Sequence, residues 1–220
     1  MIAGRSPLAW ITLASVFLSG LAVDLISKSW AFENVLGSPV VLDRDAILAG
    51  DDPLRAFPPH QREDCVVLPW GLLDFDLVLN YGAVFGIGQH ARGLFIVFTI
   101  IAVIVATSIF AFKTTARSRW VHAGIGLILA GGIGNLYDRI MFGAVRDFIH
   151  MFPGWDLPFG FEWPGGGSGL FPWVYNVADV LLLAGMVILF LGFGGESTPS
   201  PGSSSDHADG GLDVDEQGQG

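Results

Sequence analysis

Polar and charged side chains are concentrated where a long apolar stretch of this sequence ends. The segment GNLYDRIMFGAVRDFI, residues 134–149, contains Asn135, Asp138, Arg139 and Asp147. On an α-helix Asn135 shares a face with Asp138 and Arg139, because residues three and four apart are neighbours. Arg139 can neutralise Asp138 locally, so we expect an ion pair that closes a helix end. Such pairing matters, because a carboxylate at membrane depth costs about 2.5–3.5 kcal/mol on insertion scales.

Asp147 has no obvious partner nearby in the sequence. Gly143 is expected to end or bend the helix, and in an extended segment Arg146 would point to the opposite side from Asp147. Further along the chain, Asn176 and Asp179 repeat the spacing of three at the start of another apolar stretch. Two antiparallel helices joined by an outer loop would place Asp147 and Asp179 at a similar depth.

Two facing carboxylates in a poorly solvated cleft share one proton, because ionising both is costly. One carboxylate can then activate water as a base while the other protonates a carbonyl oxygen or a leaving amine. This is the chemistry of an aspartic protease, and it needs no metal and no cofactor. The spacing alone leaves two alternatives open. Acids within a membrane also act as relays in small proton- or cation-coupled carriers, and a non-enzymatic scaffold could use them as helix-end caps.

The whole sequence is typical of a membrane protein, with 51% hydrophobic and only 15% charged residues and a mean hydropathy of +0.55. A helix of about 20 residues crosses a hydrocarbon core of about 30 Å. We predict membrane-spanning helices at about 7–31, 93–113, 120–140 and 174–194. The alternative for the first is a cleaved signal peptide, and the alternative for the last two is a pair of buried helices in a soluble core.

The distribution of charge predicts the orientation. Lys113, Arg117 and Arg119 form the densest basic cluster in a short loop, so the positive-inside rule places this loop and both termini in the cytoplasm. Residues 33–92 and 141–172 are then extracytoplasmic, and the polar residues around Asp147 lie on that face of the membrane. The net charge of −10 argues against nucleic acid as a partner.

The extracytoplasmic segments have different predicted structures. Alternating apolar residues over 73–79 predict a strand, for which the upstream segment SPVVLDR, residues 38–44, is a possible partner. The segment 141–172 is rich in aromatic residues, proline and glycine, as expected of irregular backbone at the interfacial aromatic belt. The predicted fold is therefore a mainly α membrane protein, residues 1–194, with four transmembrane helices and a small extracytoplasmic β-sheet between helices 1 and 2. Residues 195–220 are predicted to be a disordered acidic tail.

Four motifs in chain order resemble those of the lipoprotein signal peptidase (signal peptidase II) family, which are membrane aspartic peptidases of bacteria. The motifs are DLISK at 24–28, NYGAVF at 80–85, GGIGNLYDR at 131–139 with GAVRDF at 143–148, and YNVAD at 175–179. The resemblance covers about residues 8–194. The chain departs from the family pattern in its long 33–79 segment, an insert around WDLPFGFEWPGGGSG, the acidic tail, and Val84, where a smaller residue is common.

The resemblance implies that Asp147 and Asp179 are the catalytic pair. It implies removal of the signal peptide from diacylglyceryl-modified prolipoproteins by cleavage just before the lipidated cysteine, with these prolipoproteins and membrane lipids as partners. Support or substrate binding is implied for Asp24, Lys28, Asn80, Gly82, Asn135, Asp138, Arg139 and Asn176. We expect a monomer with no metal, although His60, Glu63 and Asp64 leave a metal site in the outer segment as an alternative.

Overall fold

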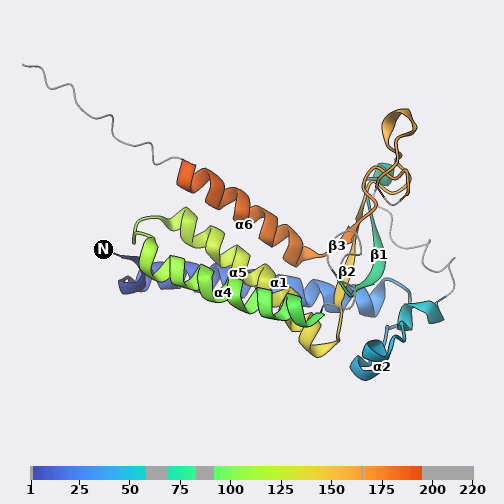
Figure 1. The fold of residues 1–220 in the computed structure, drawn as a ribbon, viewed down its shortest axis with the longest axis horizontal. Helices are drawn as coiled ribbons and strands as arrows, with labels where there is room; N and C mark the ends of the chain where they lie inside the picture. Colours follow the sequence, from blue (N-terminus) through green and yellow to red (C-terminus); the bar gives the residue numbers. More distant parts are fainter. Residues whose placement is uncertain (1, 58–68, 83–91, 165, 195–220) are drawn as a thin grey trace, which may run out of the picture.

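In the part of the chain that the structure describes, four long helices lie side by side with a small sheet at one end (Figure 1). This computed structural model describes residues 2–57, 69–82, 92–164 and 166–194. The long helices are α1 (Pro7–Asn34), α4 (Arg92–Lys113), α5 (Arg119–Met141) and α6 (Val177–Gly194). Three of them, α1, α4 and α5, are long and apolar enough to cross a membrane, and α6 is a shorter apolar helix. The protein is therefore a mainly helical membrane protein.

The remaining elements are short and gather mostly at the end of the bundle opposite the N-terminus (Figure 1). The short helices are η1 (Ala3–Arg5), α2 (Arg44–Ala49), η2 (Pro53–Ala56), η3 (Pro69–Gly71) and η5 (Pro158–Gly160). The strands are β1 (Leu73–Asn80), β2 (Val145–Met151) and β3 (Val174–Tyr175). We call the end that carries the strands the outer end of the bundle.

The sheet is assembled from two separate segments of the chain. Its order is β1-β2-β3 and both pairings are antiparallel. Only β1 comes from the segment between the first two long helices, whereas β2 and β3 flank the segment between α5 and α6. The predicted pairing of β1 with residues 38–44 is therefore wrong, and β2 takes that place. The reason is burial: Leu77 and Leu79 of β1 pack with Phe148 of β2 in one apolar core.

That outer core also ties the sheet to the helices. It contains Phe32 near the end of α1, Ile47 of α2 and Leu54 of η2, all buried against the apolar face of β1 and β2. Asp43 caps α2 by accepting hydrogen bonds from Asp45 and Ala46. The residues of α2 and η2 thus form a folded cover for one face of the sheet.

The helix α5 lies at the centre of the bundle and contacts α1, α4 and α6. Glycines allow α5 and α6 to approach closely: a Cβ at Gly131 would collide with the backbone carbonyl of Ala178, and a Cβ at Gly185 of α6 would lie 2.7 Å from the carbonyl oxygen of Gly124. Gly132 faces elsewhere, because a Cβ there would lie 3.7 Å from Thr99 of α4. Small residues allow helices in lipid to pack closely enough for extensive van der Waals contact.

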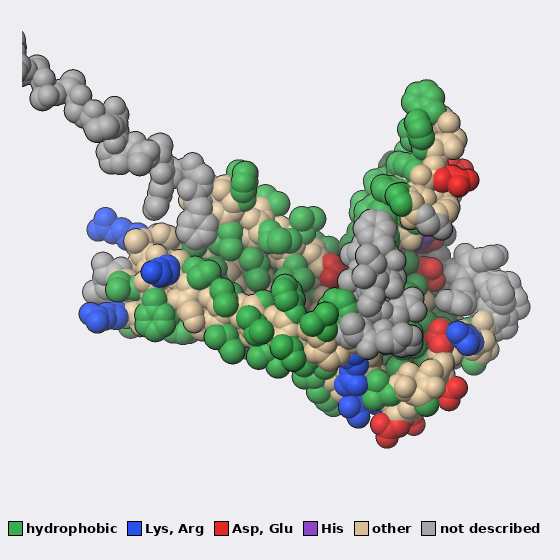
Figure 2. All heavy atoms as spheres, viewed as in Figure 1, with side chains coloured by type: hydrophobic (Ala, Val, Ile, Leu, Met, Phe, Trp, Pro, Cys, Tyr) green, Lys and Arg blue, Asp and Glu red, His purple; other side chains and the backbone are tan. Residues whose placement is uncertain are grey.

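Charged side chains lie at the two ends of the bundle and apolar side chains cover its length (Figure 2). Lys and Arg side chains are visible at both ends, whereas the Asp and Glu side chains visible on this face lie at the outer end. The apolar band is the surface expected of helices in contact with lipid. Helix α4 carries the band most completely, since Phe110 is its one buried residue.

Some predictions fall outside the described residues. They concern the acidic tail at 195–220, the local packing at Val84, and the alternative metal site at His60, Glu63 and Asp64.

We predict that Gly131→Ala destabilises the bundle whereas Gly132→Ala does not. The new methyl group at Gly131 forces α5 and α6 apart, and such overpacking typically costs about 1–3 kcal/mol. At Gly132 the methyl group meets an ordinary contact distance of 3.7 Å. Thermal unfolding of both variants in the same detergent measures the difference, and equal unfolding temperatures would contradict the described packing.

Candidate active site

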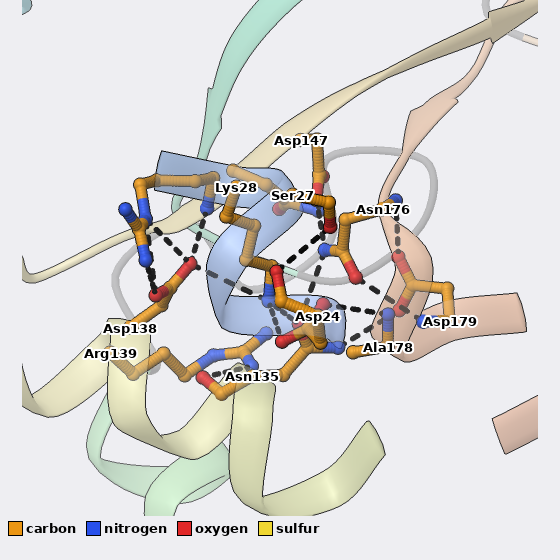
Figure 3. Close-up of polar contacts among 12 residues, drawn as sticks. Asp24, Ser27, Lys28, Asn135, Asp138, Arg139, Asp147, Asn176, Ala178 and Asp179 are labelled. Atoms are coloured by element: carbon orange, nitrogen blue, oxygen red, sulfur yellow. Dashed lines mark hydrogen bonds and ion pairs between the residues drawn. The ribbon is translucent and has the colours of Figure 1, made fainter. Parts of the chain in front are cut away.

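The polar side chains identified in the sequence meet at the outer end of the bundle, where α1, α5, β2 and the start of α6 come together (Figure 3). Helix α1 contributes Asp24 and Lys28, α5 contributes Asn135, Asp138 and Arg139, β2 contributes Asp147, and the start of α6 contributes Asn176 and Asp179. Asn80 at the end of β1 and Gly82 just after it complete the set. The structure therefore brings together all the site residues predicted from the sequence.

Four buried charges of alternating sign form the base of this region. Lys28 Nζ lies 2.9 Å from Asp24 Oδ2 and 3.5 Å from Asp138 Oδ2. Arg146 Nη2 lies 2.9 Å from Asp138 Oδ1, and the backbone N–H of Arg146 donates to Asp138 Oδ2 at 3.0 Å. Side-chain exposure is 0% for the first three residues and 5% for Arg146. Two acids and two bases balance, which is how buried charges are tolerated in a medium of low dielectric constant.

Arg139 is not the partner of Asp138, so the ion pair predicted between these neighbours is wrong. Adjacent residues on a helix do not face each other. The guanidinium of Arg139 donates instead to the carbonyl oxygens of Gly82 at 3.2 Å and Asn135 at 3.3 Å. It lies 5.2 Å from the ring centroid of Phe95. Arg139 therefore fixes the segment that follows β1 against α5.

Arg146 is the residue whose role the sequence analysis missed. Side chains alternate along a strand, so Arg146 and Asp147 of β2 point to opposite faces. The face of Arg146 meets the end of α5, where the side chain binds Asp138 and lies 4.5 Å from the ring centroid of Phe142. The available signal was the alternation itself, which directs an arginine to one side of β2 and an aspartate to the other.

Two asparagines connect the buried charges to Asp147 and Asp179. Asn135 Oδ1 accepts hydrogen bonds from Lys28 Nζ at 3.0 Å and from Asn176 Nδ2 at 3.1 Å. Asn135 Nδ2 donates to Asp179 Oδ1 at 2.9 Å, and Asn176 Nδ2 also donates to Asp147 Oδ1. A side-chain amide both accepts and donates, so it can link a cation to a carboxylate.

Asn176 and Asp179 also cap the start of α6. The N–H of Asp179 donates to Asn176 Oδ1 at 3.2 Å, and the N–H of Asn176 donates to Asp179 Oδ2 at 3.1 Å. Asp24 Oδ1 accepts from the N–H of Ala178 at 2.8 Å. This reciprocal arrangement satisfies donors that a helix leaves free at its first turn, and it places a carboxylate where the helix dipole favours negative charge. Asp179 is thus a helix cap as well as a member of the site.

The pairing of β1 with β2 determines where Asp147 lies. Val78 is opposite Asp147 and Asn80 is opposite Val145. Asn80 Nδ2 donates to Asp147 Oδ2 at 3.0 Å, while Asn80 Oδ1 accepts from the N–H of Gly82 at 3.0 Å. The second hydrogen bond fixes the orientation of the amide, so its NH₂ group faces the carboxylate.

The carboxyl group of Asp147, on β2, has a pKa well above its ordinary value. Burial raises the pKa of Asp147 to about 7, and the negative charge of Asp179 raises it in the same direction. Hydrogen bonds from Asn80 and Asn176 lower this pKa, as does the more distant charge of Lys28. At neutral pH the Asp147 carboxyl group therefore exists in both protonated and ionised forms.

Asp147 and Asp179 line one pocket with a volume of about 990 Å³. Its polar wall includes Asn80, Asn135 and Arg139. Its apolar wall includes Phe95, Phe171, Trp173, Tyr175, Val180 and Leu183. The pocket thus joins two carboxylates to a largely aromatic and aliphatic surface, a combination that suits a substrate with a polar reacting group and apolar substituents.

Among the described residues, no group of three or more His, Cys, Asp or Glu side chains could hold a metal ion. The acids of the site are occupied by the amide, ammonium and guanidinium groups described above.

Comparison with known proteins identifies one family. The family model described as signal peptidase (SPase) II, Peptidase_A8, matches residues 16–193. The lipoprotein signal peptidase of Methylorubrum extorquens is 32% identical over 180 residues, covering 79% of this chain and 80% of that protein. The lipoprotein signal peptidase of Psychromonas ingrahamii is 27% identical over 188 residues, covering 84% of each chain.

Two solved structures are similar in fold. Both are described as bacterial membrane enzyme structures obtained by the in meso method, one at 2.3 Å and one at 1.9 Å resolution. The first has a TM-score of 0.55 at 21% identity and covers 83% of this chain and 87% of its own. The second has a TM-score of 0.56 at 20% identity and covers 84% of this chain and 94% of its own.

We predict that Arg146→Gln destabilises the protein far more than Arg139→Gln. Removing one member of a buried ion pair typically costs about 3–5 kcal/mol, because the remaining charge has lost its partner. Arg146→Gln leaves Asp138 with one cation among the described residues, Lys28 at 3.5 Å, whereas the hydrogen bonds that Arg139 donates go to two uncharged backbone carbonyl groups. Unfolding in detergent measures both changes. Equal losses, or a larger loss for Arg139→Gln, would contradict the assignment of Arg146 as the partner of Asp138.

Proposed function

The chain belongs to the signal peptidase II family, and from this premise we propose that Asp147 and Asp179 are the catalytic pair of a lipoprotein signal peptidase. The protein is a protease, as its homologues are. Its substrates are prolipoproteins carrying a diacylglyceryl group, and the scissile bond is the one just before the lipidated cysteine. The competing function, a proton- or cation-coupled carrier, finds no support among these relatives.

One observation carries the choice of residues: Asp147 and Asp179 line the same pocket, and both hydrogen-bond to the same asparagine. Asn176 donates to Asp147 through its side chain and to Asp179 through its backbone. The other acids of the site, Asp24 and Asp138, are fully buried and bound to cations. Of the three acids that line the pocket, Asp76, Asp147 and Asp179, the last two are those that share Asn176.

The two carboxyl groups take different roles at the start of the reaction. Asp147, with its pKa raised to about 7, holds the proton and acts as the acid. Asp179, at the N-terminus of α6 and bonded to Asn135 and to the Asn176 backbone, acts as the base. This division of one proton between two acids is the general solution for peptide hydrolysis without a metal or a covalent intermediate.

The protons then balance over two steps. Asp179 removes a proton from a water molecule whose oxygen attacks the scissile carbonyl carbon, while Asp147 gives its proton to the carbonyl oxygen. The resulting gem-diol collapses as Asp179 gives its proton to the leaving amine, the C–N bond breaks, and Asp147 recovers a proton from a diol hydroxyl. Arg139 on the pocket wall limits the build-up of negative charge while the protons move.

The pocket and the apolar band of the bundle fit a membrane-embedded substrate. Phe95, Val180 and Leu183 extend the pocket wall along the helices, so an acyl chain can lie against them while the peptide reaches the carboxylates. The small side chain that precedes the lipidated cysteine in the substrate suits a site enclosed by β1 and the start of α6.

The site lies on the extracytoplasmic face of the inner membrane, with both termini in the cytoplasm. Support comes from the basic residues at the opposite end of the bundle (Figure 2), since short cytoplasmic loops carry an excess of Lys and Arg. Prolipoproteins present their cleavage region at that outer surface.

We predict that Asp147→Asn and Asp179→Asn each abolish cleavage of a diacylglyceryl-modified prolipoprotein, with a loss of at least about 10³-fold, because each removes one proton-transfer group. Accumulation of the uncleaved prolipoprotein in a strain lacking its own enzyme measures the effect. Glu33→Gln, which changes an exposed acid at the outer end of α1, is the matched control and should process normally. Normal processing by either Asp variant would refute the assignment of the pair.

We also predict that kcat/KM falls as the pH rises above about 7. The acid form of Asp147 is required, its pKa is raised to about 7, and deprotonation removes the proton that the carbonyl oxygen must receive. The fall should approach about tenfold per pH unit, as for loss of a single proton. Cleavage of a lipidated peptide by the purified protein from pH 5 to 10, with unfolding monitored at each pH, checks this expectation. A rate that stays constant to pH 9 would refute the role of Asp147 as the acid.

A further inference from the structure

The segment between β2 and β3 forms a projection that the catalytic chemistry does not use. We call residues 152–173 the arm. Its backbone folds back on itself through a bridge between Asp156 and Gly169 and a hydrogen bond from Leu157 N–H to the Ser168 carbonyl at 2.6 Å. Trp163 Nε1 donates to the Gly169 carbonyl at 2.8 Å, and this hydrogen bond joins the two sides of the arm. The arm thus has its own internal hydrogen bonds, although it stands apart from the bundle.

The tip of the arm exposes large aromatic side chains. Phe159 is 94% exposed, Phe161 is 64% exposed and Trp155 is 48% exposed. Phe159 also has a φ of 64°, a backbone conformation that is rare and strained for a bulky residue and natural for Asn or Gly. Phe159 adds little packing to the fold, and its backbone conformation is strained. An exposed aromatic side chain at such a position indicates an interaction with a partner outside this chain.

The placement of the arm identifies this partner. The arm extends from the outer end of the bundle, across the direction of the long helices (Figure 1). Since those helices run along the membrane normal, the arm runs along the membrane surface. It extends on the side of α6, whose exposed Leu183, Met186 and Phe190 face the surrounding lipid.

The arm is also two-sided. Its acidic side chains lie on the side that faces away from the helices, and hydrophobic side chains cover its tip and the side toward the helices (Figure 2). Asp156 and Glu162, the acids of the arm, are both exposed. A surface with charges away from the bilayer and aromatic groups toward it is the arrangement found at membrane interfaces, where aromatic rings lie at the level of the lipid headgroups.

We propose that the arm docks on the outer leaflet of the membrane through Phe159 and Phe161. The arm is connected to the pocket by aromatic contacts: Trp163 and Trp173 have ring centroids 4.6 Å apart, and Trp173 contacts Phe171 at 5.2 Å. Phe171 and Trp173 line the pocket. Docking therefore fixes the pocket wall at a constant depth relative to the lipid, a consequence that depends on the proposed peptidase function.

Fluorescence of a label at the tip tests the docking without reference to catalysis. The full chain carrying Cys65→Ser is prepared with either Phe159→Cys or Glu162→Cys, labelled with an environment-sensitive dye and reconstituted in vesicles of phosphatidylethanolamine and phosphatidylglycerol. We expect the label at 159 to emit further to the blue and to be quenched several-fold more by nitroxide-labelled lipid than the label at 162. Equal emission and equal quenching at both positions would overturn the proposal.

The same labels in an Asp179→Asn background separate this proposal from the proposed function. Docking does not involve the catalytic pair, so the quenching at 159 should be unchanged although cleavage is lost. If Asp179→Asn still cleaves while quenching persists, the catalytic assignment fails and the docking stands. If quenching is absent in both backgrounds, the docking fails, whatever the activity.

Phe159→Asn tests the consequence for substrate. Asn accepts a positive φ more readily than Phe, so the variant should unfold at the same or a higher temperature. We expect KM for a diacylglyceryl peptide in vesicles to rise several-fold with kcat unchanged, and the difference to disappear in detergent micelles, which have no extended surface. An unchanged KM in vesicles, or an equal rise in micelles, would contradict the role of the arm in positioning the pocket.

Discussion

Asp24, Lys28, Asp138 and Arg146 form a set of two buried acids and two buried bases that connects α1, α5, α6 and β2. Asp24 holds the first turn of α6, Lys28 joins α1 to α5, and Arg146 joins β2 to the end of α5. Buried charges are costly when any member is missing, so the set forms only when all three helices and the strand are in place. The outer end of the protein can therefore fold stably only when the site residues are in this arrangement.

The proposed catalytic carboxyl groups differ from this set in their partners. Asp147 accepts hydrogen bonds from the amides of Asn80 and Asn176, and Asp179 accepts from Asn135 and the Asn176 backbone. An amide stabilises a carboxylate less than a guanidinium group in direct contact does. Asp147, a buried carboxyl group with amide partners, can therefore keep a proton near neutral pH, whereas Asp138 is bound to Arg146 and has a structural role. The asparagines position the reactive groups without neutralising them.

The membrane explains features that an aqueous environment would not. The apolar band runs along the helices (Figure 2) and the pocket wall continues it, and in our proposal the exposed aromatic tip of the arm lies at the same lipid surface. A substrate anchored by acyl chains moves in two dimensions, so the depth of the site relative to that surface determines whether the scissile bond reaches the carboxylates. The sheet provides the link, since β2 carries Asp147 at one end and leads into the arm at the other.

The sequence by itself determined the local features. Apolar runs gave the positions of the long helices, alternation gave β1, and Gly143, with a φ of 89°, ends α5 as expected. The motifs also pointed to Asp147 as an acid distinct from Asp138. Only the tertiary structure decided the partners: Asp138 binds Arg146 instead of the adjacent Arg139, and β1 pairs with β2 instead of with the segment upstream. The physical reason is that periodicity and capping act within a few residues, whereas a buried charge or an open strand edge is satisfied by whichever distant segment the fold brings to it.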